Sequence, residues 1–196
     1  PIHDAVGIER INVCTYQSVS GGGKAAIEEL AHQTAALLSG KEVKTEAFSR
    51  QIAFNVIPQI DDFMDNDYTK EEMKMVWETK KIMGDDTILV NATAVRVPVF
   101  YGHGEAIHLE TRSPIDAEEV KALLANAPGI VLLADRDAFP TQVSSASGND
   151  DVHVGRVRND ISHPNGINLW VVSDNVRKGA ATNSVQIAEV LIRDYM

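Results

Sequence analysis

One stretch of the sequence places a cation and a proton carrier a few residues apart. Residues 95–105 read VRVPVFYGHGE. Arg96 alternates with two valines in a predicted strand, so its guanidinium should face away from them and needs a carboxylate or an anionic substrate as its partner. His103 lies between two glycines at a predicted turn. It suits general acid–base chemistry near neutral pH, and a polar turn histidine without a chemical role fits the pattern equally well.

A second pair of charged residues lies on a predicted helix. In the sequence TKEEMK, Glu71 and Lys74 are three residues apart and are therefore neighbours on the helix surface. From this spacing alone, the pair is interpreted as a solvated ion pair, which contributes roughly 0.3 kcal/mol to stability.

Three glycines separate a predicted strand from a predicted helix. Such glycines let the backbone approach a ligand closely, and the following helix start favours negative groups. The spacing matches neither the phosphate-binding loop GxxxxGK[ST] nor the complete GxGxxG motif. An ordinary turn is therefore the favoured interpretation of the motif SGGGK, which contains Ser20, Gly21, Gly22 and Gly23.

The only cysteine, Cys14, does not have the surroundings of a nucleophile. It lies inside a predicted strand, several residues before the next helix starts, whereas reactive thiols favour exposed positions at helix N-termini. We interpret it as a buried small hydrophobic residue. The remaining histidines show no grouping with cysteine or acids, so no metal site is predicted; they are His3, His32, His108, His153 and His163.

The composition restricts the class of protein. The 196 residues carry 18 Lys and Arg against 28 Asp and Glu, a net charge of −10 that disfavours nucleic acid and anionic membranes. No apolar run approaches the roughly 18 residues of a membrane span. A single cysteine forms no internal disulfide, which favours a reducing, cytoplasmic setting.

Strands outnumber helices in the hydrophobic pattern. We expect an α+β fold with a mixed, largely antiparallel sheet and helices on one face. Thr69 and Glu72 match a capping box at the start of one helix. Residues 52–60 are predicted to be a strand or an extended segment interrupted by Pro58. Other strands are predicted at 10–17, 87–100, 105–112, 129–135, 151–160 and 167–174, with 105–112 pairing with 87–100 and the last two forming a hairpin. Helices are predicted from Lys24 and at 70–83, 117–126 and 178–193.

Several motifs together resemble the bacterial aspartate-semialdehyde dehydrogenases. The resemblance runs through nearly the whole chain, in order and spacing. It implies the C-terminal fold of glyceraldehyde-3-phosphate-dehydrogenase-like enzymes. The motifs are TYQSVSGGGKAAIEEL, NVIPQID, YTKEEMKMVWETKKIM, NATAVRVPVFYGHGEAIHLET, VGRVRNDI and LWVVSDNVRKGAATNSVQIAE.

The resemblance implies a specific reaction. Members of the family make L-aspartate 4-semialdehyde from L-4-aspartyl phosphate with NADPH and release phosphate, a step in lysine, methionine, threonine and isoleucine synthesis. A cysteine thiolate attacks the acyl phosphate, and hydride reduces the thioester. The implied partners are this substrate, its products and a second copy of the chain in a homodimer.

The resemblance also assigns roles to residues of this chain. Gln17 resembles the glutamine that positions the substrate, and His103 resembles the acid–base residue. Glu71 resembles the carboxylate that meets the substrate's ammonium, while Lys74 resembles the phosphate-binding lysine. Arg96 resembles the clamp on the substrate carboxylate. The residues that resemble cofactor contacts, near the nicotinamide, are Ser20, Gly21, Gly22, Gly23 and Asn175.

The sequence departs from the family pattern in two ways. Gly104 stands where many members have Ser, a change that we expect to be tolerated. The family's Asn-Pro-Asn-Cys segment would fall shortly before Pro1, and no dinucleotide-binding glycine motif is present. We therefore expect residues 1–177 to be a substrate-binding and dimerisation domain, and residues 178–196 to be a helix that packs on an absent nucleotide-binding domain. The chain alone is expected to be inactive.

Two alternatives stay open. The first is a related acyl-phosphate reductase, such as an N-acetylglutamyl-phosphate reductase, whose substrate has no free ammonium for Glu71 to bind. The second is a non-catalytic paralogue that serves oligomerisation or regulation.

Overall fold

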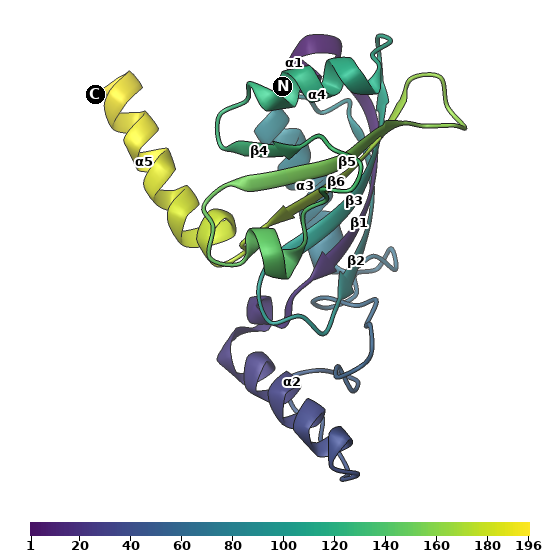
Figure 1. Cartoon of the computed structure of the whole chain (residues 1–196), viewed down its shortest axis with the longest axis vertical. Coiled ribbons are helices and arrows are strands. Elements are labelled where there is room, and N and C mark those ends of the chain that lie inside the picture. Colours follow the sequence, from purple (N-terminus) through teal and green to yellow (C-terminus); the bar gives the residue numbers. More distant parts are fainter.

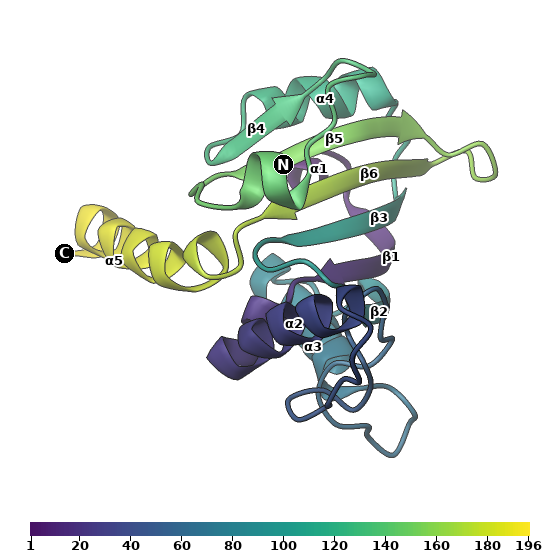
Figure 2. The same ribbon diagram turned by 60° about the horizontal axis from the view of Figure 1, so that its bottom comes forward.

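The structure, a computed structural model that describes all of residues 1–196, is built on one six-stranded sheet. The strand order is β2-β1-β3-β6-β5-β4 (Figure 2). Pairs β1/β2 and β4/β5 are parallel, and the other three pairs are antiparallel. The predicted α+β fold with a mixed sheet is confirmed. The strands are β1 (Ile8–Gln17), β2 (Leu89–Arg96), β3 (His103–Thr111), β4 (Ile130–Leu133), β5 (Val152–Asn159) and β6 (Gly166–Ser173).

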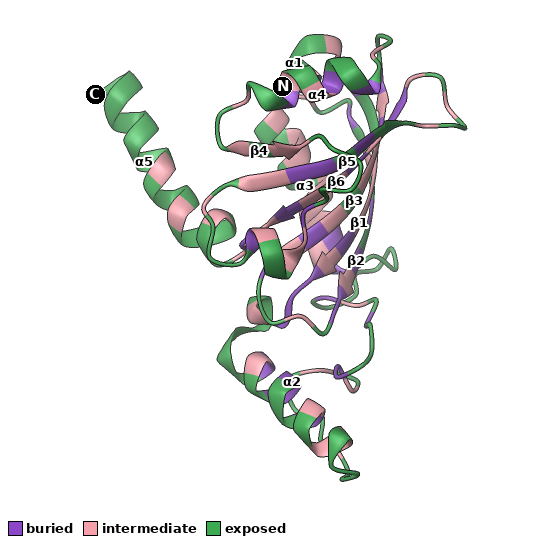
Figure 3. Ribbon diagram, viewed as in Figure 1, coloured by how far each residue is buried: buried purple, intermediate pink, exposed green.

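Helices cover one face of this sheet. The main hydrophobic core combines residues of the sheet with residues of three helices, and Ile88, Val120 and Ile167 in it are fully buried. Figure 3 shows the buried residues concentrated along the sheet. The helices of this layer are α1 (Ile2–Val6), α3 (Lys70–Met83) and α4 (Ala117–Ala125), and two more, α2 (Gly23–Leu38) and α5 (Thr182–Tyr195), extend away from the sheet (Figure 1).

The capping box predicted for α3 is present. The Thr69 hydroxyl accepts a hydrogen bond from the Glu72 amide, and the Glu72 carboxylate accepts one from the Thr69 amide at 2.7 Å. The same carboxylate accepts a third hydrogen bond, at 2.9 Å, from the amide of Ala94 in β2. One buried side chain therefore starts the helix and fixes it to the sheet.

The predicted pairing of 105–112 with 87–100 is wrong. Both β2 and β3 pair with β1, which lies between them. The reason is the long crossover from β1 to β2, which includes α3 and returns the chain parallel to β1. The short link after β2 then passes the end of β1 to reach its other side.

Two boundary predictions also need correction. Of the two interpretations of residues 52–60, the strand is wrong, because Ile57 makes only an isolated bridge to Arg96. His103 is the first residue of β3 and does not lie in the turn. Strand β2 ends at Arg96, whose backbone pairs with Ile57. The Val97 amide donates a last hydrogen bond to the Gln17 carbonyl of β1 at 3.0 Å.

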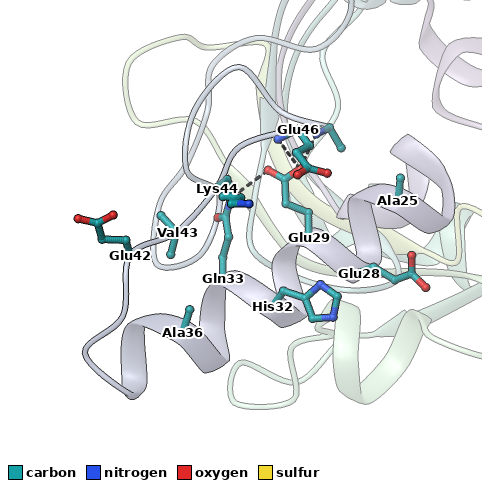
Figure 4. Close-up of a pocket in the computed structure, with 11 residues that line it drawn as sticks. Ala25, Glu28, Glu29, His32, Gln33, Ala36, Glu42, Val43, Lys44 and Glu46 are labelled. Carbon is teal, nitrogen blue, oxygen red and sulfur yellow. Dashed lines mark hydrogen bonds between the residues drawn. The ribbon is translucent and has the colours of Figure 1, made fainter.

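Helix α2 and the following loop form an arm below the sheet (Figure 1). The buried Gln33 side chain accepts hydrogen bonds from the amides of Ile52 and Ala53 and donates one to the Lys44 carbonyl at 2.8 Å. Glu29, one turn earlier, accepts hydrogen bonds from the Gln33 amide group and from loop amides (Figure 4). Two side chains of α2 thus hold the loop in place.

Helix α5 extends from the body without a partner. None of its residues is buried, and Figure 3 shows it mostly exposed. Its apolar side chains include Val185, Ile187 and Ile192, each more than half exposed. None of the helices, α5 included, has the length and apolar character that crossing a bilayer demands.

Replacing Gln33 should detach the loop from α2. We expect Gln33→Ala to lower the free energy of unfolding by about 2 kcal/mol, because three loop groups lose their partners in a buried site. Urea unfolding measures the loss, and amide exchange should locate it at residues 44–53. His32→Ala, an exposed change on the same helix, is the control. Equal stability of the two variants would contradict this description.

Candidate active site

The five residues to which the resemblance assigns catalytic or substrate-binding roles line one cavity. Its volume is about 310 Å³, and Ile60, Asp61 and Gly21 complete its wall. Because side chains alternate along a strand, the three residues that come from the sheet point to its helix-covered face. The other two come from the first turns of α3. The five are Gln17 at the end of β1, Arg96 at the end of β2, His103 at the start of β3, and Glu71 and Lys74 on α3.

Glu71 is the centre of the hydrogen-bond network in this cavity. One carboxylate oxygen accepts a hydrogen bond from the Gln17 amide at 3.0 Å, and the other accepts one from the Lys74 ammonium at 3.1 Å. Burial alone would raise the pKa of Glu71, but the hydrogen bonds from Gln17 and Lys74, with the charges of Lys74 and Arg96, outweigh it and lower the pKa. Glu71 is therefore a carboxylate at neutral pH.

Lys74 is the more accessible cation of the cavity. Its side chain is 42% exposed, and Asp61 lies 3.8 Å from its ammonium, beyond hydrogen-bond distance. The hydrogen bond to Glu71, followed by the charge of Glu71, raises the pKa of Lys74. The ammonium therefore keeps its charge and has donors left for an anion.

Arg96 is buried without a carboxylate partner in hydrogen-bond contact. Its only side-chain hydrogen bond within the chain runs to the Ser18 carbonyl at 2.7 Å. Burial lowers the pKa of Arg96, and the charge of Glu71 partly opposes this. A guanidinium has five N–H donors, so the remaining donors of Arg96 suit an anionic ligand. The strand pattern predicted either such a ligand or a carboxylate of the chain as the partner of Arg96.

His103 is held as a neutral imidazole. Its Nδ1 accepts a hydrogen bond from the Ser18 amide at 3.1 Å, which places the ring proton on Nε2. Burial, followed by the positive charge of Arg96, lowers the pKa of His103 to about 4. At neutral pH the ring is thus uncharged, with Nδ1 engaged as an acceptor and the Nε2–H group available as a hydrogen-bond donor.

The glycine stretch lies beside this cavity. A Cβ atom at Gly21 would come within 2.9 Å of an Arg96 guanidinium nitrogen, so a larger residue there would displace the guanidinium. Gly23 has a φ of 81°, which glycine adopts readily. Ser20 exchanges hydrogen bonds with the side chain of Asn175, which also accepts one from the Gly102 amide at 3.0 Å.

Three contributors to the site were not predicted. Ser18 supplies both the amide that orients His103 and the carbonyl that holds Arg96. Asp61 belongs to a loop, and Gln142 donates hydrogen bonds to the backbone of Tyr16 and Gly102. Ser18 and Asp61 lie within two of the quoted motifs, but neither motif assigns them a role, and their contacts depend on tertiary structure. The only sequence signal is that Ser18 follows Gln17.

Cys14 does not belong to this cavity. It alternates with Thr15 along β1, so it lies on the opposite face of the sheet from Gln17. The prediction that it is buried is wrong, since it is partly exposed. The prediction that it is no nucleophile of this site agrees with its position. No group of three or more His, Cys, Asp or Glu is arranged to hold a metal ion.

Gly104 has a packing role on that opposite face. A Cβ atom at this position would come within 2.8 Å of the Trp170 ring. Trp170 also contacts Tyr16, with the ring centroids 5.5 Å apart, and donates a hydrogen bond to the Pro140 carbonyl. The indole therefore occupies the space that a larger residue than glycine would need.

The protonation state of His103 can be measured directly. We expect its ring signals in NMR to titrate at a pH of about 4, with His103→Asn identifying them. Because the unfolded chain binds this proton near pH 6.5, the stability that neutral His103 contributes is lost as the pH falls from about 6.5 to about 4. Titration of the ring near pH 6.5 in the folded chain would contradict the burial and the charge arrangement.

Comparison with sequence families gives one clear match. The family described as "Semialdehyde dehydrogenase, dimerisation domain" matches residues 1–178. Aspartate-semialdehyde dehydrogenase 2 of Vibrio cholerae is 71% identical over 195 residues, covering 100% of this chain and 58% of that protein. The aspartate-semialdehyde dehydrogenase of Aquifex aeolicus is 51% identical and covers 99% and 58%. The chain therefore spans less than two thirds of the length of the curated relatives it matches.

Solved structures show the same fold. Aspartate semialdehyde dehydrogenase II of Vibrio cholerae, complexed with ASA, is 71% identical with a TM-score of 0.97, covering 100% of this chain and 58% of that one. The Candida albicans enzyme with NADP is 26% identical with a TM-score of 0.70, covering 98% and 52%.

Proposed function

Because this chain belongs to the family of semialdehyde dehydrogenase dimerisation domains, we propose that it is the substrate-binding and dimerisation part of an NADP-dependent aspartate-semialdehyde dehydrogenase. The proposed reaction is the reductive dephosphorylation of L-4-aspartyl phosphate to L-aspartate 4-semialdehyde. One observation carries the proposal: in a single cavity the Glu71 carboxylate lies with two cations, Lys74 and Arg96, while the second carboxylate, Asp61, lies 3.8 Å from the Lys74 ammonium.

The charges of the cavity match those of the substrate. Aspartyl phosphate has an ammonium, a carboxylate and a phosphate. Arg96 binds the carboxylate through the planar donors of its guanidinium, and Glu71 binds the ammonium. Lys74, the exposed cation, binds the phosphate. Each substrate charge thus meets an opposite charge that is already oriented by the fold.

Gln17 and His103 act next to the reacting carbonyl. The Gln17 side chain is fixed at both ends, accepting a hydrogen bond from Thr15 and donating one to Glu71, so it orients the substrate. His103 takes the proton of the attacking thiol at Nε2 in the tautomer that carries its own proton on Nδ1, where Ser18 Oγ lies 3.2 Å away, and the resulting imidazolium can return a proton later in the reaction. The thiol is not Cys14, which lies on the other face of the sheet. It comes from outside residues 1–196.

The glycine stretch suits the nicotinamide end of NADPH, which supplies the hydride when bound. Gly21 leaves the backbone close to Arg96 and His103, and Ser20 with Asn175 offers polar groups beside them. No dinucleotide-binding glycine motif is present in the 196 residues, so these residues fit only that end of the cofactor.

The proposal divides the chain by function. Residues 1–177 form the substrate-binding and dimerisation domain, and residues 178–196 form the helix that packs against a nucleotide-binding domain outside this chain. The exposed apolar side chains on several sides of α5 support this division. Without the thiol and that domain, residues 1–196 bind substrate and do not reduce it.

Substrate binding tests the roles of the charged residues. We expect calorimetry to detect binding of L-aspartate 4-semialdehyde to the chain, and we expect Glu71→Gln to weaken it roughly thirtyfold by removing the charge that meets the ammonium. Lys74→Ala should weaken inorganic phosphate binding, while Lys70→Ala, an exposed neighbour on α3, should not.

Two outcomes would favour the alternatives. Unchanged binding in Glu71→Gln would favour a reductase whose substrate lacks a free ammonium. Absence of any binding by the unmodified chain would favour a non-catalytic oligomerisation domain.

We also propose a homodimer formed through the open face of the sheet. Helices α1, α3 and α4 lie on the other face, and the strand registers align a polar row across five strands of this one. Asn12 and His108 in this row are only partly buried. The row consists of Asn91, Asn12, His108, Asn168 and Arg158.

A bulky charge on the open face should separate the subunits. Thr93 is exposed on that face, beside Cys14 in the register, so Thr93→Arg should sediment as a monomer at micromolar concentration. Glu118→Arg on α4, at the covered face, should remain a dimer. A monomeric unmodified chain, or a dimeric Thr93→Arg variant, would contradict this interface.

A further inference from the structure

A short segment lies on the open face of the sheet, behind the candidate active site. It is η2 (Gln142–Ala146), a single π-helical turn that contacts strands β3, β5 and β6. Just before it, the Pro140 carbonyl accepts a hydrogen bond from the Trp170 indole at 2.9 Å. Just after it, the Gly148 amide donates one to the Asp174 carboxylate at 2.8 Å. The segment is therefore attached at both ends to β6 and to the residue that follows β6.

The two glycines beside His103 leave room for this segment. Gly104 alternates with His103 along β3, so it faces the opposite side of the sheet. A Cβ atom at Gly104 would lie 3.5 Å from the Gln142 side chain. A Cβ atom at Gly102 would lie 3.2 Å from the Ala146 Cβ atom and 3.2 Å from the Gln142 carbonyl oxygen. The motif GHG thus lets η2 approach the backbone that carries His103.

The Gln142 side chain joins the ends of two strands. Its amide nitrogen donates hydrogen bonds to the Tyr16 carbonyl at 2.7 Å and to the Gly102 carbonyl at 3.0 Å. The first carbonyl belongs to the peptide group that leads into Gln17, and the second belongs to the one that leads into His103. One neutral side chain therefore holds the peptide groups that precede two residues of the site.

The next contact between the same two segments is part of the site itself. The Ser18 amide donates a hydrogen bond to the His103 Nδ1 atom at 3.1 Å. The Ser18 carbonyl also accepts the Arg96 hydrogen bond at 2.7 Å. Both contacts depend on the separation of the strand ends, which the Gln142 bridge fixes from behind.

We propose that Gln142 is a positioning residue of the active site, which acts from the opposite face of the sheet by fixing the separation of the strand ends that carry Gln17 and His103. This inference rests on the proposed function for the roles of those two residues. Gln142 does not line the cavity, so it is not itself a catalytic residue.

Protonation of His103 distinguishes positioning from a contribution to stability alone. The charged groups that act on His103 are Arg96, Glu71 and Asp174. The Gln142 side chain is neutral, and its hydrogen bonds run only to backbone carbonyls. Exchange of Gln142 for another neutral residue therefore removes no charge near the ring, and the ring titrates differently only if it moves.

NMR titration of the 196-residue chain tests the proposal. Gln142→Met keeps the length and approximate volume of the side chain and removes both donors. We expect the His103 ring to titrate about one pH unit or more above its value in the unmodified chain, because a displaced ring is less buried and further from Arg96. Calorimetry should show about tenfold weaker binding of L-aspartate 4-semialdehyde, because Gln17 loses its orientation.

Three further variants complete the experiment. Gln142→Asn keeps the amide group on a shorter stem, so it should show both changes at a smaller size, and it carries the test if Gln142→Met does not fold. Thr141→Ala removes the hydroxyl that accepts a hydrogen bond from the Ser144 amide at 3.0 Å. It should lower the midpoint of thermal unfolding without moving the His103 titration. The exposed change Val143→Ala should alter neither.

Two results would overturn the proposal. One is a folded Gln142→Met variant in which the His103 titration and the semialdehyde affinity equal those of the unmodified chain, since Gln142 would then only stabilise the fold. The other is an equal shift of the titration in Thr141→Ala, because His103 would then respond to any loss of stability in η2.

The positioning role and the proposed function can fail separately, because the His103 titration needs no ligand. Absence of semialdehyde binding by the unmodified chain would overturn the proposed function. A shifted titration in Gln142→Met would still support the control of His103 by Gln142 in that case.

Discussion

The candidate site depends on the attachment of α3 to the sheet by one buried carboxylate. Glu72 accepts hydrogen bonds from Thr69 at the start of the helix and from Ala94 in β2. Because both anchors are backbone amides, the first turn of α3 has a fixed height and rotation above the strands. Glu71 and Lys74, on either side of Glu72 in the sequence, consequently reach Gln17 and the cavity.

This anchoring determines the electrostatics of the cavity. Two cations and a neutral imidazole lie near the Glu71 carboxylate, and burial together with the neighbouring charges sets the pKa of each group. Arg96 and burial keep His103 neutral, while Lys74 and Gln17 keep Glu71 ionised. The arrangement is preorganised for a ligand that has charges of both signs, so little reorganisation accompanies binding.

The sequence predicted the fold class and the helices α2, α3, α4 and α5, because local signals determine them; the short helix α1 was not predicted. The capping box at Thr69 and Glu72 defined α3 to the residue. Strand pairing was predicted less well, since the position of β1 between β2 and β3 depends on a crossover that no local pattern encodes.

In the candidate site, too, local patterns predicted less than the tertiary structure shows. The spacing of Glu71 and Lys74 by itself indicated only a surface ion pair. The resemblance to a known family was needed to group this pair with Arg96 and His103. Ser18 was missed because it acts through backbone groups, whose contacts depend on where β1 ends and not on the side-chain type.

The central claim is that Glu71, Lys74 and Arg96 together recognise an amino-acid substrate by its charges. A crystal structure of the 196-residue chain soaked with L-aspartate 4-semialdehyde tests it most directly. The account predicts the substrate carboxylate on the Arg96 guanidinium and the ammonium on the Glu71 carboxylate. A ligand bound with its ammonium away from Glu71, or bound outside this cavity, would contradict it.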